Sequence, residues 1–533
     1  MNQLKPWYRN LGAYEWIFFY AVALLNLLPA ISHPVFPTLD GPAHLYNANV
    51  IYQLLLGDSD ILSQYYAFNT EIVPNWGGHF LLAGLYTLLP PLVAGKVFIG
   101  LCLFMLPVSF RYCVRQLNAD ARLASYLIFP FTYTFLFCLG FYNFSVGLIV
   151  LFAAIGQFLA YRKQAPRFRS LALLFVLLLL AYLSHLFVFL SAGMVILFTC
   201  SLDVIQAFLR KEQLKETLKK AVLLLLVALP PLVLTLKYFL HAHHAGAKVY
   251  LLKSELMQWI TSCRSIICYS LEEEAVYTTC VFFVLFFLAS LAVYFRGKAF
   301  RQHAVEGKAS VVAVFFLKLQ LQDVFLLIVF AFLALYFRLP DSDPTAGFIS
   351  SRLLLMVFLF LILWISGFHY PKWVMVLGLA TIFLAQYKLV RLHQQTFTGM
   401  NTEIAEVLEV ESVIRPHTVI LPVNYSANWL GVHHSNYLGI RKPVVILENY
   451  ECVNSYFPLT WHCDTAMWNL AHSEWNRLDL ILEKTSPETF KRVDYVFVQG
   501  KEAFPDSLKT ALLEHYSLRR ETPHLLLFER SGK

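Results

Sequence analysis

Long apolar runs constrain this chain more than any other feature of its sequence. They include WIFFYAVALLNLLPAI, SLALLFVLLLLAYL, AVLLLLVALPPLVL, VFFVLFFLASLAV, DVFLLIVFAFLALYF and LLLMVFLFLILWI. Each run is long enough, or nearly so, to cross about 30 Å of hydrocarbon as a helix, which pairs its own backbone polar groups. Hydrophobic residues make up 58% of the chain and charged residues only 14%, outside the range of soluble globular proteins. The sequence therefore predicts an integral membrane protein built of helices.

The distribution of basic residues predicts the orientation of these helices. Lys5 and Arg9 precede the first apolar run, whereas residues 33–95 contain no Lys or Arg. Strongly basic loops follow at 161–169, 210–220 and 296–308. Because cytoplasmic loops are enriched in Lys and Arg, we expect the N-terminus to be cytoplasmic and the 33–95 loop to lie outside. The formal net charge of +8 reflects this topology, so we predict no nucleic-acid partner.

Two apolar runs compete for the crossing that follows this loop. Residues 79–95 are a short run that ends in Pro90 and Pro91, whereas residues 96–110 lead directly into Arg111. We assign the second run as the span and the first as an outer-leaflet or re-entrant helix, which gives about 11 spans with the C-terminus outside. If the first run also crosses, the count rises by one and the N-terminal side reverses.

The chain changes character beyond Lys388. The segment NTEIAEVLEVESVI has helical spacing, while HTVILPV, PVVIL, DYVFVQ and HLLLFER are short β-rich runs. The predicted fold is an all-α polytopic membrane bundle over residues 1–390, with the long outer loop 33–95, followed by an extracytoplasmic α/β domain over 391–533. Neither G-x-G-x-x-G nor G-x-x-x-x-G-K-[ST] occurs, which disfavours a nucleotide-driven enzyme.

The stretch FPTLDGPAHLYN, residues 36–47, places polar chemistry where the chain leaves the membrane. Prolines restrict φ and glycine allows close backbone approach, so this loop is suited to aim Asp40 and His44 at the membrane surface. The alternative is that Asp40 is the N-cap of an amphipathic helix over residues 42–56, since Asp before Gly-Pro is a good helix start. Taken alone, the motif favours the cap.

The accompanying layout changes that balance. LDGPAHL and the later PNWGGHFLLAGLYTLLPPLVAGKVF lie in a long outer loop between the first spans. With the many spans and the outer C-terminal domain, this layout resembles the GT-C superfamily of integral-membrane glycosyltransferases, which includes protein mannosyltransferases and aminoarabinose transferases of lipid A. The resemblance covers most of residues 14–390, and GFYNFSVGL, LSHL and GFISSRLLLMVFLF are similar to a poorly characterised bacterial branch.

The resemblance implies transfer of a sugar from a polyprenyl-phosphate donor to a glycan, lipid or protein acceptor at the extracytoplasmic face. Asp40 would be the catalytic base of an inverting displacement, and His44 would orient it or touch the sugar. Arg352 would bind the donor phosphate, although a snorkelling arginine that anchors its helix is an equal alternative. We expect the protein in the bacterial inner membrane, among membrane lipids, with a periplasmic C-terminal domain.

Further candidates for substrate binding follow from their outward position. They are His79, Arg338, Asn143, His185, Asp341 and Asp343. A lone histidine at an apolar boundary is more often structural, and proline-flanked aspartates are ordinary turn formers. We therefore treat these residues as weaker candidates than Asp40 and Arg352.

Metal binding is where the sequence departs from the superfamily. Several members carry a second acidic residue in the next outer loop, where this chain has Asn143. A divalent metal is compatible with the resemblance, but this loop favours a mechanism without one, and we predict no metal ligands and no certain cofactor. Asp341 with Asp343, or Glu71, are alternative sources of a second carboxylate. The pairs Cys263 with Cys268 and Cys452 with Cys463 are left open as disulfides.

Two other functions remain as alternatives. A transporter or lipid flippase would place charged residues or broken helices near the bilayer midplane, and the sequence offers only Lys237, Gln320 and Asp323 there. A non-enzymatic scaffold would use the outer domain to bind a partner.

Overall fold

The chain forms two compact units. The computed structural model describes residues 14–57, 59–163, 167–241, 247–302, 311–343, 346–471 and 478–532. The helical unit comprises Met1–Pro29, Leu101–Leu136 and Ser145–His393, and the mixed unit comprises Ala30–Gly100, Phe137–Phe144 and Gln394–Lys533. The predicted domain boundary at residue 390 falls inside helix α17 (Lys372–Glu411) and stays a prediction. Lys5 and Arg9, which suggested a cytoplasmic N-terminus, lie outside the described residues.

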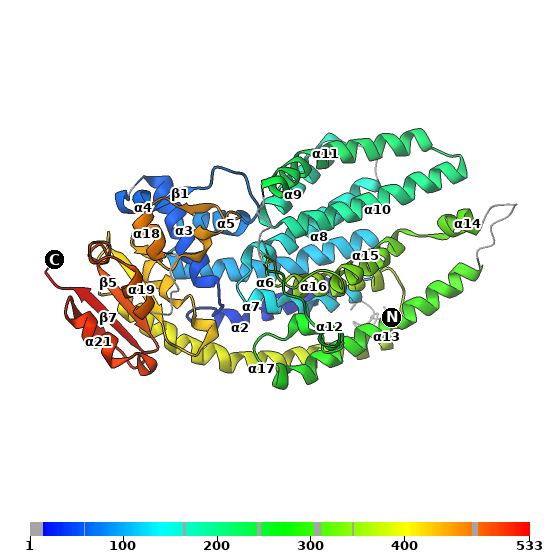
Figure 1. The fold of residues 1–533 in the computed structure, drawn as a ribbon. Helices are drawn as coiled ribbons and strands as arrows, with labels where there is room; N and C mark the ends of the chain where they lie inside the picture. Colours follow the sequence, from blue (N-terminus) through cyan, green and yellow to red (C-terminus); the bar gives the residue numbers. More distant parts are fainter. Residues whose placement is uncertain are drawn as a thin grey trace, which may run out of the picture. The chain divides into compact units, whose positions relative to one another are not determined.

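Six described helices are long and apolar enough to cross a membrane (Figure 1). They are α6 (Pro91–Leu117), α8 (Tyr142–Arg162), α10 (Leu186–Arg210), α11 (Leu214–His241), α13 (Leu271–Gln302) and α17. A helix satisfies its backbone N–H and C=O groups internally, which is the condition for entering hydrocarbon. The structure thus contains long apolar helices, as the sequence predicts. Of the six apolar runs quoted from the sequence, only those in α11 and α13 lie in these six helices.

The predicted count of about 11 spans is not confirmed. Helices α14 (Val311–Lys318) and α15 (Leu321–Tyr336) are apolar enough together but are bent by 108° at their junction. The bend follows from a new helix start, because Gln320 and Asp323 form a capping box at the N-terminus of α15. The other apolar helices are shorter, at 10–17 residues: Glu15–Ile31, Leu123–Cys138, Phe168–Ser184 and Ile349–Ile365.

The two runs that compete for the crossing before Arg111 have different lengths in the structure. Helix α5 (Gly77–Tyr86) has 10 residues and reaches only about 15 Å, half the thickness of the hydrocarbon. Helix α6 has 27 residues and is one of the six candidate spans. Length therefore favours the second run as the span, as the sequence predicts.

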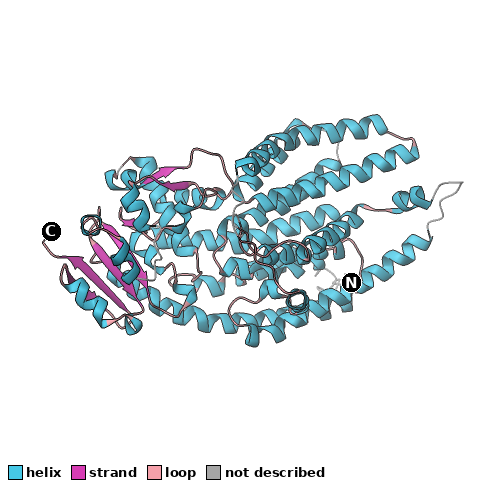
Figure 2. Cartoon of the chain, in the orientation of Figure 1, coloured by secondary structure: helices cyan, strands magenta, loops and turns pink. Residues whose placement is uncertain are grey.

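The mixed unit contains a five-stranded sheet in the order β3-β2-β5-β7-β6 (Figure 2). The strands are β2 (Val419–Asn424), β3 (Val445–Ile446), β5 (Tyr495–Gln499), β6 (Tyr516–Glu521) and β7 (Leu525–Arg530). Strand β2 pairs parallel with β3 and β5, whereas β7 pairs antiparallel with β5 and β6. All five residues of β5 are buried, as expected for a central strand. The four predicted β-rich runs correspond to β2, β3, β5 and β7.

Short helices complete the C-terminal part of the mixed unit. They are α18 (Thr465–Ala471), α19 (Leu478–Lys484), α20 (Pro487–Phe490) and α21 (Asp506–Leu513). A second, two-stranded sheet pairs β1 (Tyr66–Phe68) antiparallel with β4 (Leu459–Trp461). Backbone hydrogen bonds therefore join the segment 33–95 to the C-terminal part, a link that the sequence analysis did not predict.

Helix α3 (Gly41–Leu56) is the core of the mixed unit. Its residues from Gly41 to Ile51 are all buried, so the predicted amphipathic helix is wrong for this segment. The reason is that its polar side chains have buried partners. Asn49 donates to the carbonyl oxygen of Gly439 at 2.7 Å, and Tyr46 donates to that of Val444 at 2.8 Å. Paired polar groups are compatible with burial on every face.

All nine cysteines are free thiols. The two pairs left open by the sequence therefore form no disulfide in this structure.

Candidate functional site

Asp40 stands immediately before α3, but its side chain does not cap the helix. The carboxylate makes no capping hydrogen bond. Instead, the Thr38 hydroxyl accepts the N–H of Gly41 at 3.1 Å, and the Asp40 N–H donates to the carbonyl of Leu139 at 2.9 Å. The alternative role of Asp40 as a side-chain cap is thus not observed, and its carboxylate is available to other groups.

Two glycines, Gly41 and Gly140, allow the backbone at Gly140 to lie close against the Asp40 turn. Gly140 has a positive φ of +91°, and a Cβ added there would lie 2.8 Å from the Gly41 nitrogen and 2.9 Å from the Asp40 nitrogen. A Cβ on Gly41 would lie 2.2 Å from the Thr38 hydroxyl oxygen. Both positions exclude larger side chains. The GFYNFS segment therefore holds the Asp40 turn through backbone contact.

The Asp40 carboxylate faces a histidine that is held by a second carboxylate. His433 Nε2 lies 3.7 Å from Asp40 Oδ1, and His433 Nδ1 lies 2.5 Å from Glu448 Oε1. Both side chains are nearly closed to solvent, with exposed fractions of 9% for His433 and 13% for Asp40. The histidine thus bridges two acidic groups, an arrangement that orients the ring and stabilises its charge.

Further contacts fix this arrangement. Ser435 Oγ donates to Glu448 Oε2 at 2.8 Å and Asn436 Nδ2 donates to the same oxygen at 2.6 Å. The ring of Tyr450 stacks on His433 with centroids 4.5 Å apart. We call Asp40, His433, Glu448 and Tyr450 the acid–histidine cluster.

The protonation of the acid–histidine cluster is set by burial and by charge. Burial raises the pKa of Asp40 to about 7, against the charge of His433 and a hydrogen bond from Tyr450. Burial alone would lower the pKa of His433, but Glu448, Asp40 and Glu451 raise it above its ordinary value. A carboxyl group whose pKa lies near 7 is suited to general base catalysis.

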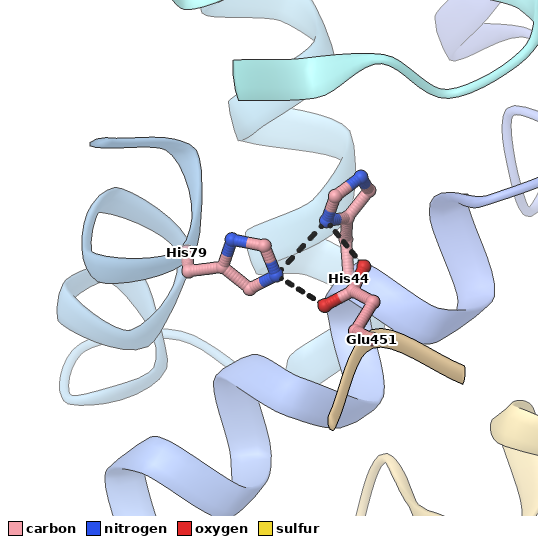
Figure 3. A group of neighbouring side chains, drawn as sticks. All are labelled: His44, His79 and Glu451. Atoms are coloured by element: carbon pink, nitrogen blue, oxygen red, sulfur yellow. Dashed lines mark hydrogen bonds and ion pairs between the residues drawn. The ribbon is translucent and has the colours of Figure 1, made fainter. Parts of the chain in front are cut away.

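A second group, the His44–His79–Glu451 cluster, lies in the same unit (Figure 3). His79 Nε2 lies 2.6 Å from Glu451 Oε2, and His44 Nδ1 lies 3.1 Å from both His79 Nε2 and Glu451 Oε1. Figure 3 shows the two rings and the carboxylate converging from three segments. All three residues are buried. Their donor types and close approach are those of a metal-binding group.

His44 is neutral near pH 7, because burial lowers its pKa to about 4 despite the nearby Glu451 carboxylate. Its ring stacks on Tyr142, with centroids 5.2 Å apart. The role of His44 in catalysis stays a prediction. Its side chain lies among buried polar groups and not on a solvated face of α3.

Asn143 and His79 lie in contact, although they are 64 residues apart in the sequence. Asn143 Oδ1 accepts the N–H of Gly78 at 2.7 Å, and its Nδ2 lies 3.2 Å from His79 Nδ1. Their roles in substrate binding stay predictions.

Arg352 belongs to the helical unit, at the start of α16 (Ile349–Ile365). Its charge acts on His185 and on Tyr238, and Asp343 also acts on Tyr238. His185 begins α10, where its Nδ1 accepts the N–H of Phe187 at 3.2 Å. The structure therefore places three of the sequence-predicted residues in one neighbourhood.

Two of the predicted residues before α16, Asp341 and Asp343, have structural contacts. Asp341 Oδ1 accepts the N–H of Ser350 at 3.1 Å, and Asp343 Oδ1 accepts that of Ala346 at 2.9 Å. These are the contacts of turn and capping residues. Arg338 is exposed. Binding of substrate by these three residues stays a prediction.

A third buried group has a clear structural use. Cys268, Glu274 and His393 lie close enough to bind a metal, but the Glu274 carboxylate already accepts the backbone N–H groups of Cys268, Tyr269 and Ser270 at 2.7–2.9 Å. Such contacts satisfy the first N–H groups around a helix start.

Sequence reasoning missed the C-terminal half of the site. The sequence analysis assigned no role to His433, Glu448, Tyr450 or Glu451. One signal was available: the strand run PVVIL is followed at once by Glu-Asn-Tyr-Glu, and acidic residues at a strand end are common in sites. Its pairing with residues some 400 positions earlier carries no sequence signature.

No family model and no curated protein matches this chain. Among solved structures, the crystal structure of ArnT from Cupriavidus metallidurans in the apo state is similar to it. The alignment covers 97% of this chain and 98% of that chain, with 10% sequence identity and a TM-score of 0.44. A likeness at this score assigns no residue role, so the roles considered below depend on the geometry of this chain.

Proposed function

We propose that this protein is an integral-membrane glycosyltransferase that transfers a sugar from a polyprenyl-phosphate donor to an acceptor at the extracytoplasmic face. The observation that carries the proposal is the Asp40 carboxyl, which is only 13% exposed, does not cap its helix and has a pKa of about 7. The long apolar helices supply the membrane setting. The acceptor is a glycan, a lipid or a protein.

In the proposed reaction Asp40 acts as the general base. Its carboxylate takes the proton of an acceptor hydroxyl or amine as that group attacks the anomeric carbon. The bond between this carbon and the phosphate oxygen breaks, and the polyprenyl phosphate leaves with the bonding electron pair, so the configuration inverts. His433, whose pKa is raised, carries positive charge that stabilises the ionised form of Asp40.

Arg352 is the proposed phosphate ligand. Its planar guanidinium presents several donors to phosphate oxygens. Its electrostatic neighbours are His185, the N-cap of α10, and Tyr238 in α11. Helices α9 (Phe168–Ser184), α10 and α11 also line an apolar groove of about 740 Å³. Phe189, one helical turn from His185, is among its lining residues. We assign this groove to the prenyl chain.

The proposal is tested with the purified full-length chain in lipid vesicles. The donors are polyprenyl phosphates that carry a labelled hexose or pentose, and the acceptors are a membrane lipid extract and envelope glycan. We expect labelled product from lipid-linked sugars and none from nucleotide sugars. Absence of product from every lipid-linked donor, with movement of those lipids across the bilayer, would instead support a flippase.

The role of Arg352 has its own test. Arg352→Ala should raise the KM for the lipid-linked donor at least tenfold, because a charged hydrogen bond to phosphate is worth about 1.5 to 3 kcal/mol. Arg169→Ala, at an exposed position of α9, is the matched control and should leave KM unchanged. An equal KM in wild type and Arg352→Ala would reassign Arg352 as a membrane anchor.

Two of the three polar residues that a transporter would need, Gln320 and Asp323, have a structural role. Arg296 Nε donates to Asp323 Oδ1 at 2.9 Å, and Asp323 also accepts the N–H of Gln320 at 2.8 Å. This pair closes a helix start at the junction of α14 and α15. The structural role of Gln320 and Asp323 favours the glycosyltransferase over a transporter.

A further inference from the structure

We propose that the His44–His79–Glu451 cluster binds one divalent transition-metal ion through His44 Nδ1, His79 Nε2 and a carboxylate oxygen of Glu451. The proposed ion is of the zinc class. This site goes beyond the proposed glycosyltransferase function and does not depend on it, because Asp40 is not among its ligands.

The spacing of the three ligand atoms fits a common ion. The two ring nitrogens are 3.1 Å apart, and Glu451 oxygens lie 2.6 Å from His79 Nε2 and 3.1 Å from His44 Nδ1. Ligands about 2.1 Å from a metal in tetrahedral or octahedral geometry are separated by roughly 3.0 to 3.4 Å. Side-chain movements of a few tenths of an ångström would therefore complete the coordination.

Hydrogen bonds alone leave this cluster incomplete. Glu451 Oε1 is buried and has no hydrogen-bond partner among the described residues, although His44 Nδ1 lies 3.1 Å away. A buried carboxylate oxygen without a donor is costly. A cation between the nitrogen and oxygen atoms satisfies all of them at once, which a single proton cannot do.

The surroundings supply the outer contacts that metal ligands usually have. Glu451 Oε2 accepts a hydrogen bond from Asn47 Nδ2 at 2.6 Å. His79 Nδ1 lies 3.1 Å from the carbonyl oxygen of Asn75, and His44 hydrogen-bonds the backbone of Gly140. When the Nδ1–H of His79 donates to Asn75, the lone pair of Nε2 faces the cluster. Carbonyl partners of this kind orient metal-binding histidines.

The ligand chemistry selects the ion. Two imidazoles and one carboxylate suit Zn²⁺, Co²⁺, Fe²⁺ or Ni²⁺, whereas Mg²⁺ and Ca²⁺ prefer oxygen ligands only. Three protein ligands leave at least one position for water.

A metal here would join three separate segments of the mixed unit. His44 lies on α3, His79 on α5, and Glu451 in the short helix η6 (Tyr450–Val453). Tyr450, the neighbour of Glu451, hydrogen-bonds Asp40. Metal binding would therefore also fix one partner of the acid–histidine cluster.

The test measures metal content of the full-length protein purified without chelator. We expect close to one zinc-class ion per chain by mass spectrometry of the elements, and less than a tenth of that in His79→Ala and in Glu451→Gln. His33→Ala is the matched control, because His33 is in the same unit and contacts Gln394 outside the cluster. It should retain the metal.

A second measurement remains informative if the cluster variants do not fold. Chelator-treated wild type is titrated with Co²⁺, whose visible absorption reports coordination by nitrogen and oxygen. We expect saturation at one Co²⁺ per chain, competition by Zn²⁺ but not by Mg²⁺, and a higher melting temperature with metal. The proposal would be overturned if the wild-type protein bound no Co²⁺ or Zn²⁺, or if the cluster variants kept the full metal content.

Discussion

At pH 7 the Asp40 carboxyl group is close to half ionised, because burial raises its pKa to about 7 while His433 opposes the shift. The proline- and glycine-bounded turn drew attention to Asp40, and the resemblance in layout made it the candidate base. It could not identify His433, which comes from the other end of the chain and whose orientation depends on Glu448. A residue in a rigid local motif can thus be proposed from sequence, whereas its charge partners are set by tertiary contacts.

The pKa of Asp40 predicts the pH dependence of sugar transfer. Only the carboxylate accepts a proton, so the rate should rise with pH around a midpoint near 7 and fall to about one tenth of its plateau at pH 6. His433→Gln removes a positive charge that lowers the pKa of Asp40, so its midpoint should move to higher pH. Initial rates between pH 5 and pH 9 measure both profiles, and a midpoint below pH 5 in wild type would contradict the assignment.

The raised pKa of Asp40 also predicts that the folded protein loses stability as the pH rises, whereas most carboxylates make a folded protein more stable at higher pH. The ordinary pKa of 3.8 is raised to about 7 in the folded protein, so folding favours the neutral acid and stability falls as pH rises from about 4 to about 7. Asp40→Asn removes this cost. Its stabilisation over wild type should be roughly 2 to 3 kcal/mol larger at pH 8 than at pH 5. Melting temperatures at the two pH values check this, and equal differences would refute it.

At the scale of elements, α3 departs most from its sequence pattern. Its polar residues suggested a solvated face, but Asn49 and Tyr46 reach carbonyl groups of the C-terminal part. Strands β2 and β5 were predictable because their runs are apolar and rich in β-branched residues, and β7 because it begins with the apolar run Leu-Leu-Leu-Phe. Strand β6, with residues YSLRRE mostly exposed, and the short pair β1–β4 lack such runs and depend on their partners.

The contact of Gly140 with the Asp40 turn predicts an effect on folding stability. Gly140→Ala would require a positive φ for a residue with a Cβ and a clash with the Asp40 and Gly41 nitrogens, so we expect a loss of about 1 to 3 kcal/mol and a displaced Asp40 turn. Thermal unfolding and transfer rate should both fall.

Gly399→Ala is the matched control in the same unit. Gly399 lies in α17, and an added Cβ meets nothing within 4 Å. Replacing a helical glycine by alanine should stabilise by about 0.5 to 1 kcal/mol. If both variants had the same melting temperature, the contact of Gly140 with the Asp40 turn would not matter for stability.

At the scale of the whole molecule, composition and charge predicted a helical membrane protein with a C-terminal α/β part. The number of spans was less predictable, because hydropathy does not show where a capping box such as that of Gln320 and Asp323 bends a helix. Nor does it show that residues 30–100 and 394–533 belong to one compact unit. That association creates both buried clusters, so the candidate site depends on it.

The most direct test of the central claim is the rate of sugar transfer in vesicles by Asp40→Asn beside Asp60→Asn, an identical change at an exposed position of α4 (Asp60–Tyr65). Asparagine cannot accept the acceptor proton, so we expect Asp40→Asn to lose at least a hundredfold in rate at unchanged protein level and membrane insertion, and Asp60→Asn to match wild type. Full transfer by Asp40→Asn would contradict the account.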